Sequence, residues 1–196
     1  MDNLRKLERT RKGFWSLDEI ASILDLPATS ARVFCSRATA RGDLVRPKRG
    51  LYVLAGWGEE ASDEQAFALS NHLQTPSYVS LLSALSWAGV STQVPGWCCE
   101  AVNPVRTARY VAEGREFRFV RLAGAQYTGF RRERGFFMAE PEKAFLDALY
   151  LASLGRYALD VEALDPSRLD RDKVARFAAL FPSPVRKRAM ALLGGA

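Results

Sequence analysis

The feature that most limits how this chain can fold is the order of helix and turn signals in its first 54 residues. Ser16 followed by Glu19 is a capping box, in which two side chains satisfy free N–H groups at the start of a helix. The helix that begins there is predicted over 17–24 and must end before Pro27, because proline disfavours helical geometry in the residue before it. An earlier helix is predicted over 3–11.

A third helix is predicted over 28–41 and is closed by Gly42. Its apolar residues fall on one stripe, made by Ala31, Phe34, Cys35 and Ala38. The opposite face has small, polar and basic side chains and no carboxylate: Thr29, Arg32, Val33, Ser36, Arg37 and Ala40. Small residues allow a close backbone approach and arginines reach guanine edges or phosphates, so this face is typical of a helix that reads DNA. Cys35 lies on the apolar stripe and is expected to pack in the core.

Two β-prone runs over 44–46 and 51–54 flank the turn sequence Pro47-Lys48-Arg49-Gly50. The resulting hairpin carries Lys48 and Arg49 at its tip. Three helices and a basic-tipped hairpin in this order predict a winged helix-turn-helix domain over residues 1–55. The third helix would enter the major groove of double-stranded DNA, and the hairpin would rest on the adjacent backbone. The candidate DNA-binding residues are Thr29, Arg32, Val33, Ser36, Arg37, Lys48 and Arg49.

The formal charge of the chain is concentrated in the same segment. Residues 1–54 hold eleven Lys and Arg and six Asp and Glu, a net charge of +5, whereas the whole chain has +6. A basic segment on a nearly neutral remainder indicates a polyanionic partner. A solvated basic face, or a winged helix used for protein contacts, would show the same pattern.

Residues 60–196 are predicted to form a second domain with a small sheet and C-terminal helices, which makes the fold class α+β. Residues 56–60 are interpreted as a linker or domain edge. The capping pair Ser62 and Gln65, and the sequence Ser183-Pro184, mark two helix starts. Helices are predicted over 64–73, 79–88, 140–154, 170–180 and 183–193, and strands over 96–103, 117–122, 126–130 and 136–139.

Composition argues against several classes of protein. Three cysteines without a CxxC pair and a single histidine disfavour disulfide frameworks, zinc sites and histidine-dependent hydrolases, and they fit a reducing cytosol. The charged segment 1–12 is unlike a secretory signal, and the charge-free segment 65–99 is interrupted by polar residues too often to cross a membrane. We therefore expect a cytoplasmic protein without a metal, a cofactor or catalytic residues.

An enzyme is the main alternative. The acids and lysine of 140–147 match in type those of metal-dependent nucleases, but Glu142 stands directly beside Lys143 instead of one residue away. Pro141 favours a helix start, and on that helix Lys143 and Asp147 can pair, worth about 0.3–0.5 kcal/mol if exposed. A protein-interaction module is the third possibility, with part of the charge-free segment 65–99 as its interface.

Three groups of motifs occur in one order along the chain. The first comprises Phe14-Trp15-Ser16-Leu17-Asp18-Glu19-Ile20-Ala21 with the runs 40–46 and 49–53, the second is Tyr78-Val79-Ser80-Leu81-Leu82-Ser83-Ala84-Leu85, and the third is Ala139-Glu140-Pro141-Glu142-Lys143-Ala144-Phe145-Leu146-Asp147. In these motifs, which are spread over most of its length, the chain resembles the AbiEi-type antitoxins of bacterial type IV toxin–antitoxin systems.

The resemblance implies a winged-helix domain that represses the protein's own operon by binding inverted repeats, followed by an antitoxin domain. It also implies a functional partner, a nucleotidyltransferase toxin encoded beside the antitoxin, with which no stable complex forms. A stand-alone winged-helix transcriptional regulator without antitoxin activity would have the same architecture.

Overall fold

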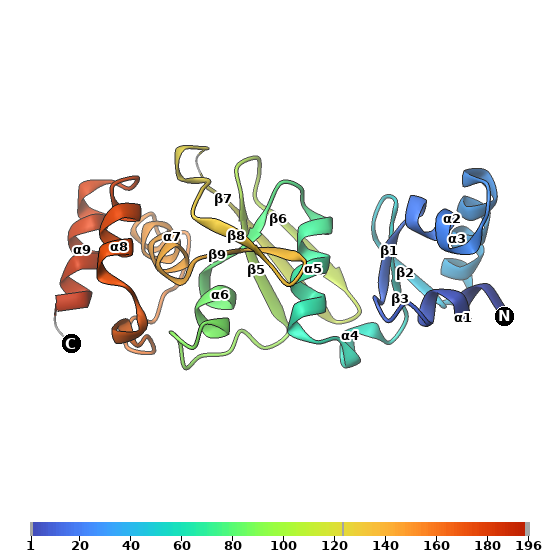
Figure 1. Ribbon diagram of the computed structural model, residues 1–196, viewed down its shortest axis with the longest axis horizontal. Coiled ribbons are helices and arrows are strands. Elements are labelled where there is room, and N and C mark those ends of the chain that lie inside the picture. The colour runs from blue at the N-terminus through green and yellow to red at the C-terminus, as the bar shows by residue number, and fades with distance from the viewer. Residues whose placement is uncertain (1, 123, 195–196) are drawn as a thin grey trace.

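The computed structural model describes residues 2–122 and 124–194, and its helices and strands are arranged around two separate sheets (Figure 1). This mixture of helices and largely antiparallel strands agrees with the predicted α+β class. Within those residues, no helix is both long enough and apolar enough to cross a bilayer.

The N-terminal module, defined here as residues 2–54, combines three helices with a three-stranded antiparallel sheet. The helices are α1 (Asp2–Glu8), α2 (Leu17–Leu24) and α3 (Ala28–Arg41), and the strands are β1 (Phe14–Ser16), β2 (Leu44–Lys48) and β3 (Leu51–Leu54) in the order β1-β3-β2. The predicted bounds of the second and third helices are confirmed, whereas the first helix ends three residues early. The strand β1 was not predicted, because three residues are too few to show an alternating pattern.

Local interactions explain where these helices begin and end. Ser16 and Glu19 form the predicted capping box at the start of α2. The helix α3 ends at Gly42, whose φ of 81° is a left-handed conformation that suits glycine. The cap therefore sets the length of α3 and the point at which β2 can begin.

The small sheet has a core on each of its faces. On one face Trp15, Leu44 and Tyr52 pack with the buried side chains of α2 and α3. On the other face Leu51 and Val53 join the core of residues 61–194, which we call the body. Because successive strand residues point to opposite faces, one sheet holds the helices of the module and also fixes the module to the body.

Residues 56–60, interpreted from the sequence as a linker or domain edge, form a packed connection between the module and the body. They contain the short helix α4 (Trp57–Glu60), and Trp57 is buried with its ring centroid 6.2 Å from that of Phe14. The N–H of Gly56 donates a hydrogen bond to Glu113 Oε2 at 2.6 Å. The connection is thus packed against both the module and the body, because its large aromatic side chain has an apolar site to fill.

Replacing Gly13 by alanine should destabilise the protein more than replacing Gly42. Both glycines have positive φ, 78° and 81°, which costs an alanine about 1–2 kcal/mol. A Cβ at Gly13 would in addition lie 1.9 Å from Trp57 Cδ1, whereas a Cβ at Gly42 meets nothing within 4 Å. Urea unfolding should therefore show a clearly larger loss for Gly13→Ala. Equal losses would mean that Trp57 is not packed as described.

The body is built on a six-stranded sheet in the order β6-β7-β5-β4-β9-β8, with parallel pairs β5–β7 and β4–β9. Helices α5, α6 and α7 pack on this sheet, and α8 and α9 pack on α7. The helices are α5 (Asp63–Leu73), α6 (Leu81–Trp87), α7 (Pro141–Ser153), α8 (Arg171–Ala178) and α9 (Ser183–Gly194). The strands are β4 (Tyr78–Val79), β5 (Cys98–Asn103), β6 (Ala108–Ala112), β7 (Arg115–Arg121), β8 (Phe130–Glu133) and β9 (Phe136–Ala139).

Two predictions for the body are wrong in detail, and one strand was missed. The predicted helix 79–88 begins only at Leu81, because Tyr78 and Val79 form the central strand β4. The predicted strand 126–130 is displaced to Phe130–Glu133, and residues 124–126 form a 3-10 turn. The edge strand β6 was not predicted, because its exposed arginine and valine obscure an apolar alternation.

Motifs two and three meet inside the body in a buried polar network. Lys143 and Asp147 form an ion pair in which both side chains are 0% exposed. Tyr78 and Ser80 donate hydrogen bonds to Asp147 Oδ2 at 3.1 and 2.9 Å, and Lys143 Nζ donates to the Tyr78 hydroxyl at 3.0 Å. Burial lowers the pKa of Lys143 and raises the pKa of Asp147, and the charge of each residue opposes the shift of the other. The small energy expected for an exposed pair therefore does not apply.

Candidate nucleic-acid interface

The helix α3 presents all five of its candidate residues to solvent. Thr29, Arg32, Val33, Ser36 and Arg37 are exposed, and the buried stripe of the helix is made by Ala31, Cys35 and Ala38, each 0% exposed. Burial raises the pKa of the Cys35 thiol to about 11, which keeps the thiol protonated at neutral pH and fits a packing role. The predicted division of the helix into a core face and a solvent face is confirmed.

A groove separates α3 from the β2–β3 hairpin, and we call it the arginine groove. Its lining includes one guanidinium from the helix, on Arg32, and two from the hairpin, on Arg46 and Arg49. The other lining residues are Leu17, Ser36, Thr39, Ala40, Gly50 and Tyr52. No carboxylate lines it, so three positive charges face one concave surface, an arrangement suited to phosphate oxygens.

Tyr52 lines the same groove and is affected by two of these charges. The guanidinium carbon of Arg46 is 6.0 Å from the centroid of the Tyr52 ring. Burial raises the pKa of the Tyr52 hydroxyl, and the charges of Arg46 and Arg32 oppose that rise. Because both arginines act on the same phenol, the helix and the hairpin bring their charges to one place.

The candidate cations are not neutralised by neighbouring acids. In the part of the chain that the structure describes, no carboxylate forms an ion pair with Arg32, Arg37, Arg46, Lys48 or Arg49. By contrast, Arg41 at the end of α3 lies 2.7 Å from Asp43. The cations on the exposed face of α3 and on the hairpin therefore keep their charge available to an external anion.

A second groove runs along the other side of α3. Thr29, Val33 and Arg37 line it, together with residues of α1 and of the turns beside α3. The helix thus forms a ridge between two grooves, with Arg32 and Ser36 on one flank and Arg37 on the other. A projecting helix of this kind fits the major groove of a duplex in shape.

Lys48 does not line the arginine groove, and a β-bulge explains why. The register between β2 and β3 shifts ahead of Lys48, so that two residues of β2 oppose Tyr52 and Lys48 pairs with Leu51. Paired residues share a face, so Lys48 lies on the side of the sheet that faces the body. Consistent with this position, burial lowers the pKa of His72 in α5 and the charge of Lys48 lowers it further.

Among the three arginines of the groove, Arg46 is the one that the sequence analysis did not include among its candidates. In a regular strand Arg46 and Lys48 would lie on the same side of the hairpin, but the bulge places them on opposite sides. Pro47 was the available signal, because proline in a strand is largely confined to edges and bulges. The hairpin therefore contributes Arg46 and Arg49 to the groove, while Lys48, predicted with Arg49 at the hairpin tip, lies on the opposite face of the sheet.

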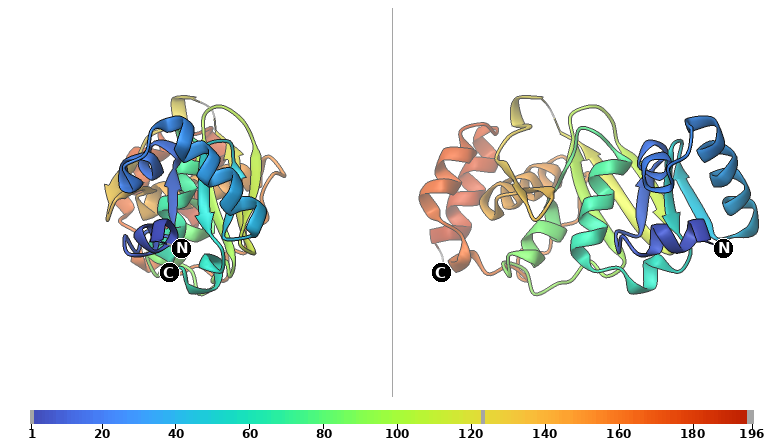
Figure 2. Two further views of the ribbon diagram at one scale, coloured as in Figure 1. Left: turned by 90° about the vertical axis from the view of Figure 1, so that its right-hand side faces the viewer. Right: turned by 45° about the vertical axis from the view of Figure 1, so that its right-hand side comes forward.

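A second basic cluster lies far from this surface. Arg186, Lys187 and Arg188 are exposed on α9, and Figures 1 and 2 place α9 at the opposite end of the molecule from the module. They do not form one surface with the arginine groove. Replacing these three residues therefore provides a control that removes as many positive charges as replacing the three arginines of the arginine groove.

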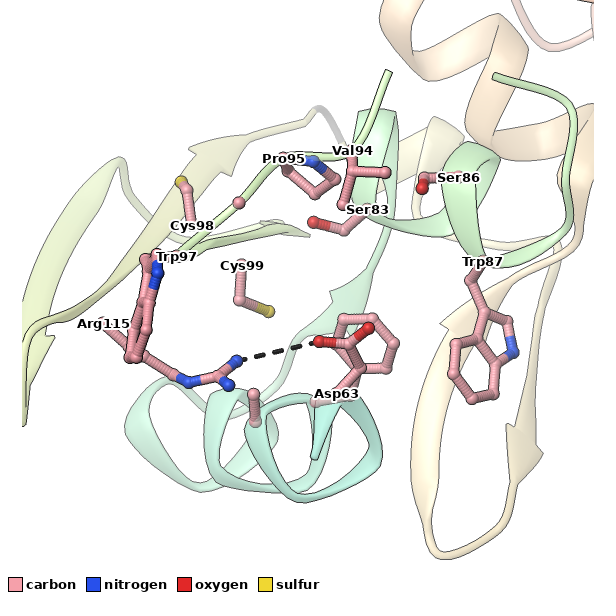
Figure 3. Close-up of a pocket in the computed structure, with 13 residues that line it drawn as sticks. Asp63, Ser83, Ser86, Trp87, Val94, Pro95, Trp97, Cys98, Cys99 and Arg115 are labelled. Atoms are coloured by element: carbon pink, nitrogen blue, oxygen red, sulfur yellow. Dashed lines mark ion pairs between the residues drawn. The ribbon is translucent and has the colours of Figure 1, made fainter. Parts of the chain in front are cut away.

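The body contains a cavity of about 230 Å³ between α5, α6 and the start of β5 (Figure 3). Arg115 lies 5.0 Å from the centroid of the Trp97 ring and 3.7 Å from Asp63. It also donates hydrogen bonds to the carbonyl oxygens of Gly58 and Ala61, at 3.0 and 2.5 Å. Small-molecule sites usually have volumes of about 300–1,000 Å³, and here the only guanidinium is already bonded to the connection at α4. The cavity is therefore better explained as a small space left between packed elements than as a ligand-binding site.

The acids considered for a nuclease do not converge on an open site. Across residues 2–122 and 124–194, no three His, Cys, Asp or Glu side chains gather closely enough to hold a metal ion. Asp147 is bonded within the buried network, and Glu142 Oε1 accepts a hydrogen bond from the N–H of Asp170 at 3.1 Å. Glu140 lies 3.1 Å from Lys173 Nζ in α8. These contacts attach α7 to its neighbours.

Comparison with known proteins gives a fold relationship. No protein-family model matches the chain, and no curated protein matches its sequence. The crystal structure of the RV2827C protein from Mycobacterium tuberculosis is similar, with a TM-score of 0.65 and 16% sequence identity. The similarity covers 97% of this chain and 74% of that protein. The chain therefore shares its fold, through the module and the body alike, with the RV2827C protein.

Proposed function

We propose that residues 2–54 form a winged helix-turn-helix domain that binds double-stranded DNA. In this proposal α3 enters the major groove, and the β2–β3 hairpin rests as the wing on the neighbouring phosphates. The observation that supports it best is the arginine groove, where Arg32, Arg46 and Arg49 meet on one surface without a carboxylate. The exposed face of α3, with Thr29, Ser36 and Arg37, supplies the remaining contacts.

We propose further that the protein is an autorepressor and the antitoxin of a type IV toxin–antitoxin pair. The resemblance to AbiEi-type antitoxins supports this, and so does the contact between its second and third motifs through Tyr78, Ser80, Lys143 and Asp147. The partners are operator DNA with inverted repeats and a nucleotidyltransferase toxin encoded nearby, which is countered without a stable complex. The setting is the cytoplasm.

DNA binding is tested with the full chain and a duplex that contains the region upstream of its own gene. We expect a mobility shift at low salt whose apparent affinity falls steeply with salt, because phosphate contacts release counterions. Unrelated duplexes should bind more weakly. No shift on any duplex at low salt would contradict the proposal.

Antitoxin activity is tested separately, by expressing a neighbouring nucleotidyltransferase with and without this chain and measuring growth. Rescue of growth would support the antitoxin role, and DNA binding without rescue would leave the alternative of a stand-alone regulator. The nuclease alternative is tested by incubating DNA with the protein and magnesium. Cleavage abolished by Glu142→Ala would favour an enzyme.

A further inference from the structure

Val33 is an apolar side chain on the exposed face of α3, where Thr29, Arg32, Ser36 and Arg37 are its polar neighbours; on one flank it also lines the second groove with Leu4, Leu26 and Phe34. It is 49% exposed and is the one large exposed hydrophobic residue among the described residues of the module. At about 100° per residue it lies roughly 200° round α3 from Ala31, which places it opposite the buried stripe. In the proposed DNA complex this position faces the floor of the major groove.

The residues around Val33 allow it to reach that floor. Thr29 and Arg37 lie one turn away on either side, and Ser36 and Ala40 complete the outward face. Apart from Arg32 and Arg37, whose long side chains can bend aside to a phosphate or a base edge, the residues of this face are short, so the helix axis can approach the bases until the two methyl groups of Val33 touch them. Arg37 is long enough to extend past Val33 to a base edge or a phosphate.

Base chemistry then selects the contact that Val33 can make. In the major groove the four bases present hydrogen-bond donors and acceptors, and thymine also presents an apolar group, its 5-methyl. A valine cannot satisfy a donor or an acceptor, and burying one against it would leave that group unpaired. We infer that Val33 reads the 5-methyl group of a thymine in the operator, an inference that rests on the proposed function.

The test replaces thymine by uracil, which removes only the methyl group. Duplexes that bind the full chain are recovered from a random library, and deoxyuridine is then placed at one thymidine position at a time. We expect one such position in each half-site to weaken wild-type binding about fourfold, the equivalent of one buried methylene-sized group. Val33→Ser should bind the thymine duplex with a similar loss and should not distinguish uracil from thymine there.

Two comparisons make the result specific. Val105→Ser changes a comparably exposed valine of the body, 58% exposed, and should keep the wild-type discrimination between thymine and uracil. Val33→Thr retains one methyl group and should keep part of the discrimination between thymine and uracil. Wild-type binding that is insensitive to uracil at every position, or discrimination that persists in Val33→Ser, would overturn the inference. Recovery of no duplex would instead refute the proposed function, and the inference with it.

Discussion

Replacing Arg32, Arg46 and Arg49 together by alanine should weaken binding to duplex DNA by at least about a thousandfold at low salt. Each hydrogen bond to a charged group is worth about 1.5–3 kcal/mol, and the three guanidiniums line one groove. The slope of log affinity against log salt should become less steep by about three units, since each lost phosphate contact removes about 0.9. The loss should apply to cognate and unrelated sequences alike, because phosphates carry no sequence information.

The control is the triple variant Arg186→Ala, Lys187→Ala and Arg188→Ala. It also removes three positive charges, but from the opposite end of the molecule. If the arginine groove acts through local contacts, this variant should bind nearly as tightly as the wild type with an unchanged salt slope. Equal losses in the two variants would show that net charge alone drives binding.

Replacing Lys143 by methionine should lower the free energy of unfolding by about 3–5 kcal/mol. The substitution leaves the carboxylate of Asp147 buried without its counter-charge, and an unpaired buried charge is strongly destabilising. Since domains are usually stable by only about 5–15 kcal/mol, the loss is a large share of the total. Urea unfolding followed by circular dichroism measures it.

A double variant and an exposed pair provide the controls for this prediction. Lys143→Met with Asp147→Asn should recover much of the loss, because no unpaired charge then stays buried and the amide oxygen of the asparagine can still accept hydrogen bonds from Tyr78 and Ser80. Lys173→Met breaks the partly exposed pair with Glu140 and should cost less than about 1 kcal/mol. A loss below about 1 kcal/mol for Lys143→Met would contradict the account of the network.

The module was more predictable from sequence than the body because its signals are local. A capping box at Ser16 and a glycine cap at Gly42 fix helix ends within one turn of the chain. The strand β4, by contrast, is two residues long and exists because β5 and β9 lie on either side of it. That pairing joins residues far apart in sequence, so it cannot be predicted from the local sequence around Tyr78 and Val79.

The candidate site was predictable on the helix and only partly on the hairpin. Helical periodicity assigned Arg32 and Ser36 to the exposed face, where the structure places them. In a strand, the face on which each residue lies depends on strict alternation, and the bulge at Pro47 interrupts that alternation. As a result Arg46 lines the groove, and Lys48 lies on the opposite face of the sheet. The burial of Lys143 was likewise not predictable, because it depends on Tyr78 from another part of the chain.

The most direct test of where the duplex binds is amide hydrogen exchange of the full chain, measured with and without bound DNA. The account predicts slower exchange in α3 and in residues 44–50, and no change in α9, which lies at the far end of the molecule. Protection confined to the body, with α3 and the hairpin exchanging as in the free protein, would contradict it.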